Sequence, residues 1–259
     1  NTFFAEAGAP NNAKEVFRDF DGDAILYSSN FVGHSKTVAI LKPLGTDPTK
    51  SYELIYYLHG DIGLNGAART YTYALGNQIK AMIEQNRNVI VVLMDIDPYP
   101  YSYLSELWAD GTFNNFHGEV IEKMIEYFSW RPSPLLPEVK IPPQPPKFFT
   151  IKAHGGGSRM LKNIVQKLDN KYIGQSTALR RIDLLDANWG MELPIISTIT
   201  SPKWKSRGVV LGANFEIQAV AGSKVFDEQL VPTKERLKQI QNRKGVWAEE
   251  VNTSYNSMP

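Results

Sequence analysis

The chain lacks cysteine entirely, and none of its 259 residues beyond position 154 is a histidine. Without cysteine, the chain can form no disulfide, thiolate nucleophile or cysteine-ligated zinc site. The chain also has no excess of charge of one sign. It contains 28 Lys and Arg residues and 27 Asp and Glu residues, which give a net charge of +1. The sequence has no cluster of Lys and Arg residues of the kind that binds the phosphate backbone of nucleic acid, which argues against nucleic acid as a partner. No apolar run approaches the roughly 20 residues that span a bilayer, so we expect no membrane span.

Length and composition predict one compact domain over residues 1–259, with 42% hydrophobic residues to fill its core. An irregular N-terminal arm is expected over about residues 1–23, and a proline-rich connector over 132–146. The first residue is Asn1 and not methionine, which fits a chain from which a signal peptide was removed. We therefore expect a secreted or periplasmic protein.

Strand and helix patterns alternate along the chain and predict an α/β fold, a mostly parallel central sheet with helices on both faces. Two antiparallel strands open it, at Asp23–Ser28 and Lys36–Leu41, with a turn at Gly33. Helical periodicity is present in Tyr73–Gln85 and Glu119–Phe128.

The segment Phe148–Leu161 has the layout of a hydrolase nucleophile elbow: an apolar strand, a glycine-built turn and a helix. In the pattern G-x-S-x-G, small residues two positions either side of the serine let strand and helix approach closely. Ala153 and Gly157 are those small residues here, and the central position is Gly155. The nucleophile position is therefore vacant, and we expect Gly155 to adopt a strained or positive φ.

Three further segments resemble the α/β-hydrolase superfamily, of the secreted serine esterase and peptidase type. They are an apolar strand running into His-Gly, a β-branched strand, and a strand ending in Leu-Leu-Asp-Ala-Asn-Trp-Gly: Tyr52–Gly63, Asn88–Asp95 and Arg181–Gly190. With the elbow, the resemblance extends from about Tyr52 to Ala221. It implies an oxyanion hole built from the backbone N–H groups of Gly156 and of Asp61 or Ile62.

A triad also needs an acid and a base after the nucleophile. Asp186, at the end of a predicted strand, is the favoured acid, with Asp227 as the alternative and turn capping as the structural interpretation. Tyr255 stands near the position where the superfamily places its histidine, and a phenol with a pKa of about 10 is a poor base. Either the native chain continues and its histidine is lost, or the site has degenerated.

Other residues near the elbow have structural interpretations. Ser158 is expected in the first turn of the helix, satisfying free N–H groups. His154 beside the vacant position is a candidate ligand contact, or a packing residue, and His59 would shape the oxyanion loop.

Two acidic segments, Asp95–Asp97 and Asp19–Asp23, are interpreted as turns because their spacing fits no complete metal motif. No metal or cofactor is predicted.

The aromatic segment Tyr99–Trp108 follows a strand at the sheet edge where open α/β proteins bind ligands. Its residues Tyr101 and Trp108, with Trp189, either line a cleft for sugar or aromatic groups or pack a lid.

The sequence thus supports two hypotheses. The first is a degenerate hydrolase-like protein that binds a small molecule, glycan or peptide in the residual cleft. The second is a secreted ester or amide hydrolase, present here with its serine substituted and its C-terminus cut short.

Overall fold

The computed structural model describes residues 11–12, 20–31, 34–47, 49–58, 76–94, 111–129, 144–175, 177–185, 191–224, 240 and 243–254. Its strands are β1 (Asn11–Asn12), β2 (Gly22–Phe31), β3 (His34–Pro43), β4 (Glu53–Leu58), β5 (Val89–Met94), β6 (Phe148–His154), β7 (Leu179–Leu185), β8 (Glu216–Lys224) and β9 (Val246–Ser254). Its helices are α2 (Gly76–Glu84), α4 (Thr112–Ser129), α5 (Gly157–Lys167), the 3₁₀ turn η3 (Asn170–Tyr172), α6 (Glu192–Ile199) and α7 (Pro202–Lys205).

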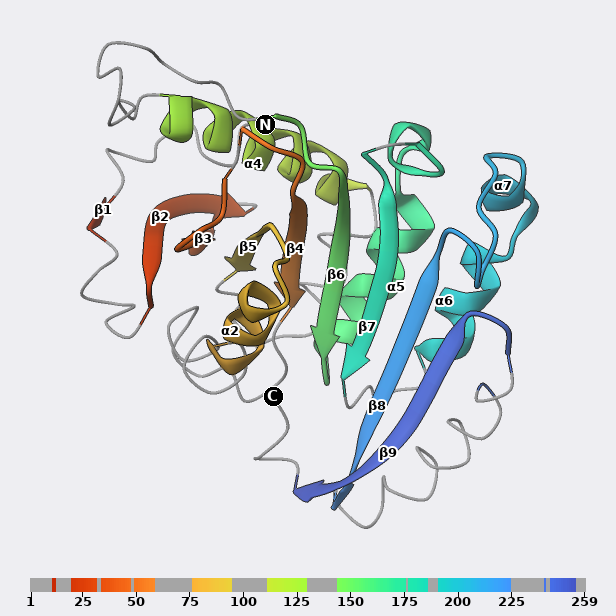
Figure 1. Cartoon of the computed structure of the whole chain (residues 1–259). Coiled ribbons are helices and arrows are strands. Elements are labelled where there is room, and N and C mark those ends of the chain that lie inside the picture. Colours follow the sequence, from red (N-terminus) through yellow and green to blue (C-terminus); the bar gives the residue numbers. More distant parts are fainter. Residues whose placement is uncertain are drawn as a thin grey trace.

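The described strands form a nine-stranded mixed sheet in the order β1-β2-β3-β5-β4-β6-β7-β8-β9 (Figure 1). The strands from β1 to β3 pair antiparallel, and β3 also pairs antiparallel with β5. From β5 to β9 every pairing is parallel. The carboxyl ends of β4 to β9 therefore lie at one edge of the sheet, where open α/β proteins bind ligands.

One face of the sheet is covered by α4, α5 and α6 around the larger apolar core. On α5 the buried apolar residues are Met160, Leu161, Ile164 and Val165, spaced as one side of a helix. They pack with alternate residues of β6, namely Phe149, Ile151 and Ala153.

The opposite face has a smaller apolar core around α2. Ile79 and Met82 of α2 belong to one cluster with Ile55, Val91 and other residues of β3, β4 and β5. Figure 1 shows α2 in front of β4 and β5, with α5 and α6 on the other face of the sheet, behind β7 and β8. The molecule therefore has the three-layer arrangement that the sequence predicts.

Most of the predicted elements are confirmed, with shifted bounds. The two opening strands are longer than expected, and the predicted helix at Glu119–Phe128 is the second half of α4, which begins at Thr112. The helix begins earlier because Phe113, Phe116 and His117 continue its buried side one turn further back. The last strand of the sheet is β9, which begins at Val246.

Two glycines bring the turn before β9 against the turn before β8. Gly245 has φ +78°, and a Cβ built on it would lie 2.1 Å from the backbone nitrogen of Gly212. Gly208 has nearly the same φ, +79°, but a Cβ there would meet no atom within 4 Å. Substitutions at Gly208 and Gly245 therefore distinguish the cost of a left-handed backbone from the cost of a steric clash.

We predict that Gly208→Ala lowers the free energy of unfolding by about 1–2 kcal/mol, the cost of a left-handed residue. Gly245→Ala should lower it by about 2–5 kcal/mol, because the methyl group adds a clash with backbone that cannot move freely. Denaturant unfolding of both variants measures the difference. Equal losses would show that the two turns do not touch as described.

Candidate functional site

The turn between β6 and α5 places Gly155 at the carboxyl edge of the sheet. Gly155 has φ +50°, in the left-handed region that glycine adopts without steric cost. Its N–H donates to the carbonyl oxygen of Leu185 at 2.9 Å, so the turn is tied to the last residue of β7. Gly156 follows as the N-cap of α5. The predicted strand, glycine turn and helix are confirmed.

Ser158 is fully buried in the first turn of α5. Its Oγ donates to the carbonyl oxygen of Gly155 at 2.8 Å. The sequence analysis expected this hydroxyl to accept hydrogen bonds from free N–H groups, and that expectation is wrong. The hydroxyl donates to a carbonyl oxygen, and α5 has no side-chain cap. The bond holds Ser158 inside the elbow, away from any reacting atom at the surface.

The structure places three of the predicted site residues together at the end of β6: His154, Gly155 and Gly156. His154 is half-buried and ends the strand. The other candidates lie outside the described residues: Asp61, Ile62, Tyr101, Trp108, Asp186, Trp189, Asp227 and Tyr255. Their roles stay predictions.

A buried aromatic cluster lies in the larger core, on the face of the sheet that α4, α5 and α6 cover, between β4, β6 and α4. The hydroxyl of Tyr56 and Nδ1 of His117 form a hydrogen bond, and both side chains are 0% exposed. The ring of His117 is 4.4 Å from that of Phe149 and 4.6 Å from that of Tyr172, centre to centre. Burial, and secondarily the charge of Lys171, lowers the pKa of His117 from 6.5 to about 3. This histidine is neutral at physiological pH and belongs to the core.

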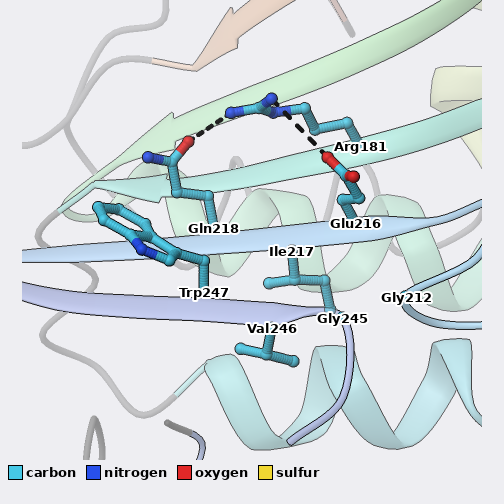
Figure 2. A pocket seen from close by; sticks show the side chains of 8 residues that line it. All are labelled: Arg181, Gly212, Glu216, Ile217, Gln218, Gly245, Val246 and Trp247. Atoms are coloured by element: carbon cyan, nitrogen blue, oxygen red, sulfur yellow. Dashed lines mark hydrogen bonds and ion pairs between the residues drawn. The ribbon is translucent and has the colours of Figure 1, made fainter.

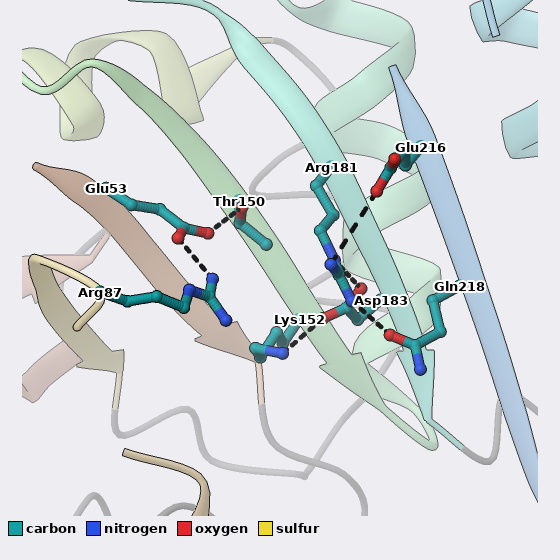
Figure 3. Close-up of polar contacts among 8 residues, drawn as sticks. All are labelled: Glu53, Arg87, Thr150, Lys152, Arg181, Asp183, Glu216 and Gln218. Carbon is teal, nitrogen blue, oxygen red and sulfur yellow. Dashed lines mark hydrogen bonds and ion pairs between the residues drawn. The ribbon is translucent and has the colours of Figure 1, made fainter. Parts of the chain in front are cut away.

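A charged network crosses β6, β7 and β8 on the side of the sheet that carries α2 (Figure 3). Asp183 is 1% exposed and is the centre of this network. One of its oxygens pairs with Lys152 and the other accepts from Nε of Arg181 at 2.7 Å. Arg181 also donates to Gln218 and lies 3.9 Å from Glu216.

A second polar contact joins β4 to β6 on the same face. Oγ1 of Thr150 donates to Glu53 at 2.7 Å, and Arg87 pairs with the other oxygen of Glu53 (Figure 3). The charged groups on this face are therefore paired across neighbouring strands, as buried charges must be. Within the described ranges, no group of three or more His, Asp or Glu side chains could hold a metal ion. No helix in those ranges is long and apolar enough to cross a membrane.

Comparison with solved structures identifies the architecture. A mutant of the feruloyl esterase module from Clostridium thermocellum, complexed with sinapinate, aligns over 100% of this chain and 95% of its own, with 10% identity and a TM-score of 0.55. A ferulic acid esterase aligns over 91% of this chain and 92% of its own, with 11% identity and a TM-score of 0.55. The chain has the α/β-hydrolase fold.

Ferric enterobactin esterase from Salmonella typhimurium shares this α/β-hydrolase fold over 98% of the present chain and 57% of its own, with 10% identity and a TM-score of 0.51. No protein-family model matches the sequence, and no curated protein matches it either. At these identities the likeness extends to the fold alone.

Sequence reasoning missed the charged network and the buried pair of Tyr56 and His117. A signal for the network was present in the alternation of β6 and β7, where Thr150, Lys152, Arg181 and Asp183 occupy every second position. Such alternation marks a strand with one polar face. No comparable pattern marks His117, whose spacing is that of any residue on the inner side of α4.

His117 makes the stability of this protein depend on pH. In the unfolded chain its imidazole binds a proton near pH 6.5, whereas in the folded chain it does so only near 3. Between these values the unfolded state holds more protons, so stability is complete above pH 6.5 and is lost as the pH falls toward 3. We predict that His117→Phe removes up to about 1.4 kcal/mol per pH unit from the slope of unfolding free energy against pH in this window.

The measurement is denaturant unfolding of both proteins at a series of pH values. Because the slopes are compared, a constant loss of stability from the substitution does not matter. Parallel curves for the two proteins would mean that His117 titrates normally in the folded chain.

Proposed function

We propose that this protein uses the α/β-hydrolase fold to bind a ligand at the carboxyl edge of the sheet, without Ser-His-acid hydrolysis. The observation that carries the proposal is Gly155 at the elbow, with φ +50°. The position that holds a nucleophile in the fold has no side chain here. The neighbouring hydroxyl, Ser158, is buried and bonded to the carbonyl of Gly155.

The distribution of histidines supports the same proposal. All four precede or form the end of β6, whereas the triad order places the base after the acid. His117 is buried with Tyr56 in the core and is not available as the base. Tyr255 stands near the expected position, and a phenol, with an ordinary pKa of about 10, is a poor base at neutral pH.

The ligand is proposed to be a small molecule, glycan or peptide held by the elbow and its neighbours. Gly156, His154 and the oxyanion-loop residues Asp61 and Ile62 would supply polar contacts, and Tyr101, Trp108 and Trp189 aromatic ones. Asp186, the proposed acid position, directly follows Leu185, whose carbonyl accepts the hydrogen bond from Gly155. Secretion or export belongs to the same proposal.

The alternative is a secreted serine ester or amide hydrolase whose nucleophile is substituted in this chain. Its support is the likeness to solved structures whose names describe esterases. The two functions differ in what a restored serine would do.

We predict that Gly155→Ser alone gives little hydrolysis of a p-nitrophenyl ester. The turn already has the left-handed backbone, so the serine costs about 1–2 kcal/mol of strain and the chain still folds. An oxyanion hole contributes on the order of 10²–10³ in rate, but a serine without a base is a weak nucleophile. Gly155→Ser combined with Tyr255→His should be faster, on the order of 10² if the new imidazole reaches the serine.

Initial rates of the single and double variants make the comparison, and Tyr255→His alone is the control for background hydrolysis. A single variant that already has full activity would reveal an intact base and acid, and would favour the hydrolase alternative.

A further inference from the structure

A second possible site lies away from the elbow, at the beginnings of β7, β8 and β9. An open pocket of about 460 Å³ occupies this part of the sheet face (Figure 2). Its volume is within the range of small-molecule sites. It is lined by Arg181, Gly212, Glu216, Ile217, Gln218, Gly245, Val246 and Trp247.

The pocket is separate from the elbow. Arg181 is the register partner of Glu216 near the start of β7, and it lies four positions before Leu185, whose carbonyl accepts from Gly155. At about 3.3 Å per residue the two places are on the order of 13 Å apart along the strand. Gln218 and Trp247, which also line the pocket, lie at the level of Asp183, two positions before Leu185 and on the neighbouring strands β8 and β9. None of the residues that line the pocket belongs to the elbow.

Hydrogen bonds fix the guanidinium of Arg181, which forms part of the polar side of the pocket. Buried Asp183 accepts from Nε of Arg181, and Gln218 accepts from the same guanidinium. Figure 2 shows the guanidinium between Gln218 and Glu216. Arg181 is one-third exposed, and its orientation is fixed before any ligand arrives.

The apolar side is the indole of Trp247, which is 48% exposed. Trp247 and Gln218 are register partners on β9 and β8, so their side chains leave the sheet on the same face about 4.8 Å apart. Bare backbone lies at the end of the pocket, because Gly212 and Gly245 are too close for either to carry a Cβ. A flat aromatic surface therefore stands beside fixed hydrogen-bonding groups.

Charge limits what such a pocket can bind. The guanidinium of Arg181 already faces two carboxylates, those of Asp183 and Glu216. Glu216 is 72% exposed, and its carboxylate would repel an anionic ligand. A phosphate or carboxylate group would find no uncompensated cation among the lining residues. The remaining groups, an amide, a carboxylate and guanidinium N–H bonds, suit hydroxyl groups, which donate and accept.

We propose that this pocket binds a neutral sugar ring, with its apolar face stacked on Trp247 and its hydroxyl groups bonded to Gln218, Glu216 and Arg181. A sugar ring combines a flat C–H face with a rim of hydroxyls, which matches the indole and the polar side. The site is independent of the proposed function at the elbow, because binding here needs neither a nucleophile nor a base.

The test is isothermal titration of the full chain with cellotriose and, separately, maltotriose, with inorganic phosphate as the anionic comparison. We expect saturable binding of at least one trisaccharide and none of phosphate. Trp247→Ala should weaken this binding about tenfold, the upper end of an aromatic contact, and Trp247→Phe should weaken it less. Gln218→Ala should weaken it as well.

Val210→Ala is the matched control, because Val210 is 52% exposed but does not line the pocket. It should leave binding unchanged, and circular dichroism should show every variant folded. Absence of saturable trisaccharide binding would overturn the proposal, as would binding that Trp247→Ala and Gln218→Ala leave intact. Binding of phosphate alone would assign an anion site instead. A dimer that Trp247→Ala dissociates, with no sugar binding, would assign the face to a second copy of the chain.

Discussion

The hydrogen bond from Gly155 to Leu185 connects the parts of the protein on which any function at the sheet edge depends. It joins the end of β6 to the end of β7 at the point where the chain leaves the sheet and enters α5. The left-handed backbone of Gly155 makes that departure sharp, so that α5 returns directly over the sheet and buries its apolar side. Oγ of Ser158 closes the turn by donating to the carbonyl of Gly155. The elbow is complete as a backbone structure and lacks the side chain that would make it catalytic.

The sheet faces differ in how they are stabilised. The face under α4, α5 and α6 is apolar, apart from groups such as the buried pair of Tyr56 and His117. The other face is apolar near α2 and charged over β6, β7 and β8. Removing one partner of a buried ion pair costs several kcal/mol, because the other charge is left unsatisfied. Asp183, with two cationic neighbours, is therefore a strong constraint on how β6, β7 and β8 align, and it also fixes the guanidinium that faces the pocket near Trp247.

The elbow was predictable because its signal is local: small residues at fixed spacing around Gly155, between an apolar strand and an apolar helix. The charged network was not predicted, although alternate polar residues in β6 and β7 carried a signal, because pairing partners come from strands far apart in the sequence. Helix α6 has low intrinsic helix propensity, with a proline and β-branched residues. It forms because Ile195, Ile196 and Ile199 are buried against the core. Tertiary packing of this kind leaves little local trace.

The elbow of this protein, as described above, contains no activated nucleophile. The most direct measurement is intact-mass analysis of the unmodified chain after incubation with a fluorophosphonate probe, with an active serine hydrolase as the positive control. Covalent labelling by this probe requires an activated hydroxyl. We expect no adduct on the chain under conditions that label the control fully. An adduct at one site per chain would contradict it, and mapping that adduct to Ser158 would show that the buried hydroxyl is the nucleophile after all.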